Sequence, residues 1–181
     1  MTIALRDQPV LLWGMMGTGK STLVNVLSSI HHVPTVDLDA EITSVTGRTP
    51  ADLIGELGLK EFRDLERSTL TMLLDSGRYE FIALGGGTLL EAGFREMVRH
   101  RTFVVSLFAE PSILVERLEE NRSTRPLLAE STGRLEDRII SLLEQRRSAY
   151  LDVDCVIDVS GIELEHCAMH LLGLFEEKVV A

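Results

Sequence analysis

The sequence predicts an α/β fold, in which a mostly parallel β-sheet is wrapped by helices. Short apolar runs of strand length alternate along the chain with longer stretches of helical periodicity, and this alternation is typical of that class. The 181 residues are 45% hydrophobic and 25% charged, which suits one domain with a single core. No repeat, low-complexity tract or linker divides the chain. Residues 1–181 are therefore expected to form one domain.

Five runs are the expected strands, and most are continuously apolar because both faces of such a sheet are covered. They are Pro9–Trp13, Pro34–Leu38, Glu80–Leu84, Thr102–Phe108 and Cys155–Val159. Helices are expected where apolar residues recur at three- and four-residue spacing. They are Lys20–Ile30, Leu59–Leu74, Ser112–Glu119, Arg134–Tyr150 and Ile162–Phe175. The polar stretch Glu119–Gly133 lacks a clear period and contains Pro126, so we expect a functional lid there.

The net charge of −10 argues against nucleic acid and anionic membranes as partners, because binding to either depends on clustered Lys and Arg. A site for an anionic ligand must therefore be locally basic. No apolar run approaches the roughly 20 residues that span a bilayer, and nothing resembles a signal peptide. Cys155 and Cys167 form no metal-binding or disulfide pattern, so both are expected to be reduced and mostly buried. We expect a cytoplasmic monomer that acts on small molecules.

The strongest functional signal is the run GMMGTGKS at 14–21, which matches the phosphate-binding pattern G-x-x-x-x-G-K-[ST] in full. A predicted strand precedes it and a predicted helix follows it, so a chance glycine-rich turn is a poor explanation. Glycines let backbone N–H groups approach phosphate oxygens, and the helix N-terminus adds positive charge. Lys20 is expected to reach the β- and γ-phosphates of ATP, and the Ser21 hydroxyl to bind Mg²⁺. The candidate nucleotide contacts are Gly14, Gly17, Thr18, Gly19, Lys20, Ser21 and Thr22.

Two carboxylates, Asp37 and Asp39, close the second predicted strand. Residues two apart in an extended chain point the same way, so both are expected to face one site at the carboxyl edge of the sheet. The alternative is that Asp39 is only the N-cap of a helix over Ala40–Val45. Beside the phosphate loop, a metal or substrate role is the better interpretation.

Four further features each have two interpretations. Phe62-Arg63-x-x-Glu66 is expected on a helix, where Arg63 and Glu66 could form a surface ion pair of small value. Gly85-Gly86-Gly87 follows a strand, where it is either a ligand-binding loop or a plain turn. Arg122 and Arg125 of the predicted lid could belong to a solvated loop. Arg146 and Arg147 could simply offset a helix dipole.

Together these motifs occur in the order GxxGxGKST, DxD, FRxxE, GGG, RPLL and RxxxY. They lie at Gly14–Thr22, Asp37–Asp39, Phe62–Glu66, Gly85–Gly87, Arg125–Leu128 and Arg146–Tyr150. In this order and spacing the chain resembles the shikimate kinase family over nearly its whole length. The resemblance implies a P-loop kinase fold whose five-stranded parallel sheet has the order 2-3-1-4-5. It also implies substrate-binding helices over about 39–75 and a lid over about 119–133.

The resemblance implies a reaction, the transfer of the γ-phosphoryl group of ATP to the 3-hydroxyl of shikimate with Mg²⁺. Ser21 and Asp37 would hold Mg²⁺, the latter through water, and Asp39 would contact the reacting hydroxyl. Arg63 and Arg146 would clamp the substrate carboxylate. Backbone atoms of Gly85, Gly86 and Gly87 would contact the substrate, and Arg125 would reach the ATP phosphates from the lid.

Two departures from the family pattern concern substrate choice. Ile54 stands where the family commonly has phenylalanine, and Leu59 where it commonly has glutamate. Neither removes a charged contact to the substrate, so the reaction class stands. Because the departures concern the ring substituents, the alternative is a kinase of another hydroxylated acid, such as gluconate or an aminated shikimate relative. A GTPase switch would carry an NKxD guanine-reading motif, and the sequence has none. The arginine placement also fits a carboxylate better than the second nucleotide of an adenylate-type kinase.

Overall fold

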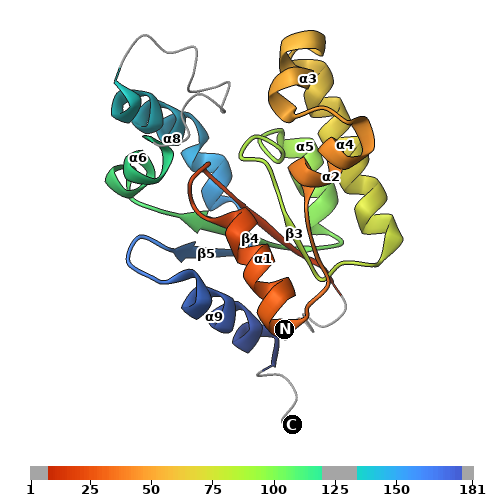
Figure 1. The fold of residues 1–181 in the computed structure, drawn as a ribbon, viewed down its shortest axis with the longest axis vertical. Coiled ribbons are helices and arrows are strands. Elements are labelled where there is room, and N and C mark those ends of the chain that lie inside the picture. Colours follow the sequence, from red (N-terminus) through yellow and green to blue (C-terminus); the bar gives the residue numbers. More distant parts are fainter. Residues whose placement is uncertain (1–7, 120–133, 177–181) are drawn as a thin grey trace.

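The computed structural model describes residues 8–119 and 134–176. Five parallel strands form one sheet in the order β2-β3-β1-β4-β5 (Figure 1). The strands are β1 (Val10–Gly14), β2 (Thr35–Asp37), β3 (Phe81–Ala83), β4 (Phe103–Phe108) and β5 (Cys155–Asp158). Every ladder is parallel. The α/β class and the strand order that the resemblance implied are both confirmed.

Helices connect the strands and cover the sheet. They are α1 (Lys20–His31), α2 (Leu38–Thr46), α3 (Pro50–Leu57), α4 (Leu59–Ser76), α5 (Ala92–Arg99), α6 (Pro111–Glu119), α8 (Leu135–Leu151) and α9 (Leu164–Glu176). In Figure 1, α1 lies in front of the sheet near α9, while α2, α3 and α4 gather on the side of β3 away from β4. Helices α6 and α8 lie together at the opposite end, above β4 and β5.

The expected strands and helices all appear, each within about two residues of its predicted bounds. Helices α2 and α3 lie in the segment 39–75, for which only the resemblance implied helices, and the short helix α5 was not predicted. The second predicted strand ends one residue early, because α2 begins at Leu38 and takes Asp39 into its first turn. Of the predicted lid, residues 120–133 lie outside the described residues, so its closure stays a prediction.

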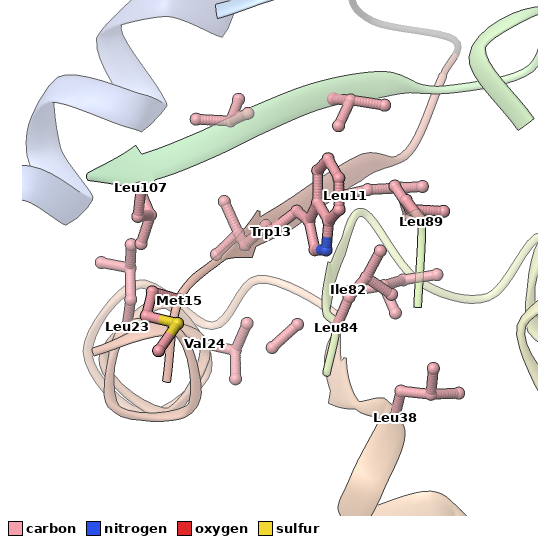
Figure 2. Close-up of a cluster of buried hydrophobic side chains, with 14 of the residues drawn as sticks. Leu11, Trp13, Met15, Leu23, Val24, Leu38, Ile82, Leu84, Leu89 and Leu107 are labelled. Atoms are coloured by element: carbon pink, nitrogen blue, oxygen red, sulfur yellow. The ribbon is translucent and has the colours of Figure 1, made fainter. Parts of the chain in front are cut away.

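The core is built on the central strand β1, all of whose residues are buried. Figure 2 shows side chains from β1, α1, β3 and β4 that meet there, among them Leu11, Trp13, Leu23, Ile82 and Leu107. Trp13 also contacts the Tyr150 ring of α8 edge to face, with centroids 4.7 Å apart. Leu38 and Leu89 are fully buried, so the segments that leave β2 and β3 are anchored in the core. This packing fixes the strand ends that carry the functional motifs.

The strand order creates a crevice between the carboxyl ends of β1 and β3. These neighbours lead through α1 and α5 to strands on opposite sides of the sheet. Because such crossovers are right-handed, the two connections pass over opposite faces and the loops that begin them diverge. The phosphate loop follows β1 and the triple-glycine loop follows β3, so both border the crevice.

Each cysteine carries a thiol that is not in a disulfide, Cys167 buried and Cys155 half-buried, as expected. Burial raises the pKa of both thiols. Among the helices of residues 8–119 and 134–176, none is long and apolar enough to cross a bilayer.

We predict that Gly14→Ala destabilises the protein, whereas Gly55→Ala stabilises it. Gly14 has φ 129°, and a Cβ there would overlap the carbonyl oxygen of Leu107 on β4. The strain is expected to lower the free energy of unfolding by about 1–3 kcal/mol. Gly55 lies inside α3 with open space around it, so alanine should add about 0.4–1 kcal/mol. Urea denaturation measures both; equal effects of the two variants would contradict the packing at Gly14.

Candidate active site

The phosphate loop joins β1 to α1 and owes its shape to glycines. Gly14, Gly17 and Gly19 all have positive φ, a conformation that other residues rarely adopt. Gly19 is the N-cap of α1 and supplies no side-chain oxygen, so the first N–H groups of the helix lack a side-chain cap. A helix N-terminus with uncapped N–H groups is a binding site for anions.

Two side chains of this segment, Lys20 and Thr18, hydrogen-bond to carbonyl oxygens of the loop itself. The Lys20 ammonium donates to the carbonyl oxygens of Gly14 and Met15 at 3.0 and 2.9 Å. The fully buried Thr18 donates its hydroxyl to the Met15 carbonyl at 2.8 Å. Thr18 thus braces the loop with its side chain, which leaves only its backbone for the predicted nucleotide contact.

A cavity of about 360 Å³ opens over this loop. Most of the predicted nucleotide and metal residues line it, together with the edge of the triple-glycine loop. The lining consists of Met16, Gly17, Gly19, Lys20, Ser21, Thr22, Asp37, Asp39, Leu84, Gly85, Gly86, Arg117 and Leu164. We call it the nucleotide cavity.

Arg117 of α6 is a lining residue that the motifs did not indicate. Its guanidinium donates to the carbonyl of Gly17 at 3.2 Å and to that of Val159 at 3.5 Å. It therefore links the phosphate loop to the segment after β5, which brings Leu164 to the same cavity. Only the sheet order brings Arg117 within reach of Gly17, one hundred residues earlier in the chain.

The two aspartates reach the cavity by a different geometry from the one expected. Asp37 ends β2 and is the N-cap of α2, where its Oδ1 accepts from the backbone N–H groups of Asp39 and Ala40. Asp39 lies in the first turn of the helix. The extended-chain argument for a shared direction is therefore wrong, and so is the alternative in which Asp39 is the cap. Both carboxylates nevertheless line the nucleotide cavity.

Ser21 and Asp37 are the oxygen donors on this cavity that would suit Mg²⁺. Across the part of the chain that the structure describes, no group of three or more His, Cys, Asp or Glu residues could hold a metal ion. Mg²⁺ commonly keeps waters and binds phosphate oxygens together with one or two protein ligands. The Ser21 hydroxyl and the carboxylate of Asp37, which caps α2 beside the phosphate loop, fit that mode.

A second cavity, of about 470 Å³, adjoins the first, and we call it the acid cavity. It brings together residues from six separate segments of the chain. They are Met16, Asp39, Thr49, Pro50, Ala51, Ile54, Phe62, Arg63, Glu66, Gly85, Gly86, Gly87 and Arg146. Every residue predicted to bind the substrate is in this set. Of the two departures from the family pattern, Ile54 lines the cavity, whereas Leu59 is 45% exposed and does not.

Arg63 and Glu66 do form the ion pair, but they are not a surface pair. Glu66 is fully buried, and its carboxylate accepts from the Arg63 guanidinium and from the Thr88 hydroxyl, the latter at 2.8 Å. The Arg63 guanidinium also lies over the Phe62 ring, 5.6 Å from its centroid. A buried carboxylate with two donors fixes the direction of the guanidinium. Arg63 is therefore held as a preoriented cation on the acid cavity.

The triple-glycine loop packs directly against these charged groups. A Cβ on Gly87 would overlap the Arg63 guanidinium, and one on Gly85 would lie 2.6 Å from Glu66 Oε1. Gly86 has no side chain either, and its carbonyl accepts from the Tyr150 hydroxyl at 2.9 Å. Close approach of Glu66 and Arg63 accounts for glycine at positions 85 and 87, which the plain-turn interpretation does not.

Arg146 lies on the opposite wall, late in α8. It is only 8% exposed, so it does not serve merely to offset the helix dipole at the surface. Its Nη1 donates to the Tyr150 hydroxyl at 3.5 Å. Arg147, in contrast, lines a separate, mostly apolar cavity between β4, β5, α6 and α8. The acid cavity thus has two guanidinium groups, from α4 and α8.

Among the residues that the structure describes, Asp39 is the one carboxylate that lines both cavities. Burial raises its pKa to about 6, and the negative charges of Glu66 and Asp37 add to the shift. Lys20 and Arg63 act in the opposite direction but do not offset it. A carboxylate of this kind is ionised at neutral pH and can accept a hydrogen bond or a proton. Arg125, the remaining predicted catalytic residue, lies outside the described residues.

Comparisons with known proteins agree with this geometry. The sequence profile of the shikimate kinase family matches residues 16–173. The chain belongs to the shikimate kinase family. It is 34% identical over 154 residues to the shikimate kinase of Rhodopseudomonas palustris, a match that covers 85% of this chain and 74% of that protein. It is 32% identical over 178 residues to that of Geobacter sulfurreducens, with 98% and 96% covered.

Solved structures of the family have the same fold. Shikimate kinase from Acinetobacter baumannii in complex with shikimate superposes with a TM-score of 0.84 and 27% identity, covering 96% of each chain. A gluconokinase from Sinorhizobium meliloti has a TM-score of 0.58 and 18% identity, which indicates a shared fold alone. The family prediction is confirmed, and membership makes the protein an ATP-dependent kinase.

We predict that Asp39→Asn raises the stability of the isolated protein at neutral pH. The native pKa of about 6 lies above the ordinary value of 3.8, so the folded state disfavours the charged form. That penalty is fully present above pH 6, falls as the carboxylate takes up a proton, and vanishes below about pH 4, where both states are protonated. The variant should therefore exceed the parent most at pH 7–8 and least at pH 4.

Urea denaturation between pH 4 and 8 tests this, and Asp64→Asn is the matched control. Asp64 lies on α4 with a side chain that is 62% exposed, so its replacement should change stability by under about 0.5 kcal/mol at every pH. Loss of stability in Asp39→Asn at pH 8 would contradict the burial of an unfavourable charge.

Proposed function

We propose that the protein transfers the γ-phosphoryl group of ATP to the 3-hydroxyl of shikimate, with Asp39 at the point of transfer. The observation that carries this proposal is the junction of the two cavities. Asp39 lines both, with Lys20 on the nucleotide side and Arg63 on the acid side. A substrate hydroxyl held against Asp39 would then face the γ-phosphate of an ATP molecule whose phosphates bind in the phosphate loop.

The acid cavity is suited to a carboxylate despite the acidic character of the whole chain. Arg63 and Arg146 come from facing walls, and both are largely buried. Hydrogen bonds from guanidinium groups to a carboxylate act at short range, whereas the net charge of −10 acts through solvent and is screened within about 8–10 Å at physiological salt. A locally basic clamp in an acidic protein is therefore physically consistent.

Phosphoryl transfer requires positioning and charge neutralisation more than covalent chemistry. Lys20 would leave the carbonyl oxygens of its own loop for the phosphates, since it already lies on the floor of the nucleotide cavity. Mg²⁺, held by Ser21 and through water by Asp37, would neutralise charge on the β- and γ-phosphates. Arg125 would add a further positive charge, and Asp39 would orient the hydroxyl and accept its proton.

The apolar residues that line the acid cavity favour a ring over a linear sugar acid. Phe62 and Ile54 form an apolar side of the cavity beside the Arg63 guanidinium. A cyclohexene acid has an apolar face that such side chains can cover, while every carbon of the gluconate chain carries a polar group. We also propose that the protein acts as a monomer in the cytoplasm.

We predict that Arg63→Ala weakens shikimate binding strongly and leaves binding of an ATP analogue nearly unchanged. The substrate carboxylate would lose a charge-assisted partner, and Glu66 would be left buried without its cation, so the loss should be on the order of 2–5 kcal/mol. Calorimetric titration of each ligand against the same variant makes the measurement.

Arg67→Ala is the matched control for this variant. Arg67 lies one turn further along α4, pairs with Asp64 and Glu91, and lines neither cavity. Its removal should change both affinities by less than about 1 kcal/mol. If Arg63→Ala binds shikimate as tightly as the parent protein does, the carboxylate clamp is wrong, and the substrate assignment fails with it.

A further inference from the structure

The triple-glycine loop lacks the means to hold its own shape. Three consecutive glycines have no side chains, and the turns at Gly85–Thr88 and Gly87–Leu90 close through backbone hydrogen bonds of 3.2 and 3.3 Å. Glycine also has the greatest conformational freedom to lose on ordering. The position of this loop must therefore be set by groups outside it.

Three groups hydrogen-bond to the segment 85–90 from outside it. Tyr150 of α8 donates to the Gly86 carbonyl at 2.9 Å. The Thr88 hydroxyl lies 2.8 Å from Glu66 Oε1 on α4 and 3.0 Å from the Gly85 carbonyl oxygen, so its single proton is shared between these two acceptors. The end is held by Arg95, a residue of α5 to which neither the motifs nor the proposed reaction assigns a role.

Arg95 joins the end of the loop to the end of α8. Its Nη1 donates to the carbonyl oxygens of Leu89 and Leu90 at 2.8 and 3.4 Å. Its Nε and Nη2 both donate to Oδ2 of Asp152 at 3.0 and 2.7 Å. The arginine is 7% exposed. One buried guanidinium thus bonds a loop carbonyl pair and a carboxylate 57 residues further along the chain.

Asp152 is at an unfavourable place for a carboxylate unless it has such a partner. It is the C-cap of α8, where the helix dipole disfavours negative charge. Hydrogen bonds from Arg95, and the charges of Arg95 and Arg99, lower its pKa. The same helix end carries Tyr150 and, one turn earlier, Arg146. Arg95 therefore ties the loop to the element that supplies the second guanidinium of the acid cavity.

We propose that Arg95 is a positioning residue that locks the loop 85–90 to the C-terminal end of α8 and thereby sets the affinity for the acid substrate. Without it, the loop keeps its internal backbone hydrogen bonds, the buried Leu89 side chain and the contacts to α4 and Tyr150, but no hydrogen bond ties its end to the end of α8. The distance between the loop and Arg146 is then no longer fixed at both ends. Gly87 and Arg146 line only the acid cavity, so the effect falls on the acid far more than on the nucleotide.

Arg99 provides a matched control, because it shares the partner but not the loop. It also lies on α5, and it donates to Asp152 Oδ1 at 2.9 Å and to Asp154 at 3.2 Å. Neither of these bonds involves residues 85–90, and a third of the Arg99 side chain is exposed. A residue that matters only because it pairs with Asp152 would behave like Arg99.

The first experiment compares Arg95→Met with Arg99→Met and does not depend on the proposed reaction. Hydrogen exchange is followed in peptides spanning residues 84–91 with no ligand added. The amides of Thr88 and Leu90 are hydrogen-bonded within the loop, so their exchange reports its order. We expect faster exchange in Arg95→Met alone. Equal exchange in parent, Arg95→Met and Arg99→Met would overturn the positioning role.

The second experiment, which rests on the proposed function, titrates shikimate and an ATP analogue against the same proteins. Arg95→Met should raise the dissociation constant for shikimate about tenfold or more, since small misplacements of positioning groups have effects of that size. Its constant for the ATP analogue, and both constants of Arg99→Met, should stay within about twofold of the parent values. Equal weakening of both ligands in Arg95→Met would overturn the proposal, because it would indicate a merely structural residue.

Arg95→Lys keeps the test decisive should Arg95→Met fail to fold. Lysine retains the charge but not the fork that reaches Asp152 and the carbonyls together. It should therefore show an intermediate loss of shikimate affinity with normal binding of the ATP analogue. Parent-like affinity for shikimate in Arg95→Lys would overturn the proposal. A parent protein that fails to bind shikimate would refute the proposed function instead, while the exchange experiment still decides the role of Arg95.

Discussion

The charge arrangement around Asp39 is the constraint on which the site depends. Burial raises the pKa of Asp39, and the neighbouring carboxylates Glu66 and Asp37 raise it further, although Lys20 and Arg63 are nearby. Each flanking acid has a structural role of its own, since Asp37 caps α2 and Glu66 directs Arg63 and Thr88. Of these three acids, Asp39 alone lines both cavities. An unfavourable buried charge at such a junction is typical of functional sites and is retained against stability.

Much of the fold and the site could be predicted because it depends on residue patterns that are local in the sequence. The phosphate loop combines a residue pattern with a strand and a helix on either side, so its position and conformation follow from a dozen residues. The strands follow from apolar runs, and the parallel sheet follows from their alternation with helices. The order of motifs along the chain then indicated a single family, which the profile match confirms. Interpretations that rested on one residue pair were less secure.

Asp37 and Asp39 were assigned to one strand, although the start of α2 is set locally, by the Asp37 cap that places Asp39 in the first turn. The other failures have a common physical origin in contacts between distant segments. The Arg63–Glu66 pair was ambiguous, because its burial depends on Thr88, 22 residues further along the chain. Arg117 and Arg95 each bond backbone carbonyls, which have no sequence signature. Arg95 also lies on α5, which is only eight residues long and was not predicted.

Fold and substrate are separate questions in this architecture. The gluconokinase shares the fold at 18% identity, so a phosphate loop on this sheet does not identify the acid. Discrimination must come from the residues that line the acid cavity and are not part of the phosphate loop. In this chain those are the two guanidinium groups, the glycine loop and the apolar side formed by Phe62 and Ile54. Substitution of Ile54 for the common aromatic residue alters that side without removing a charge.

A competition assay tests the central claim most directly. The protein is incubated with ATP and Mg²⁺ and an equimolar mixture of shikimate and gluconate, and the products are identified by mass spectrometry and phosphorus NMR. We expect shikimate 3-phosphate to accumulate and phosphogluconate to form at less than about a hundredth of its rate, since the apolar side of the acid cavity would leave hydroxyl groups of gluconate unpaired. Comparable or faster phosphorylation of gluconate would contradict the central claim.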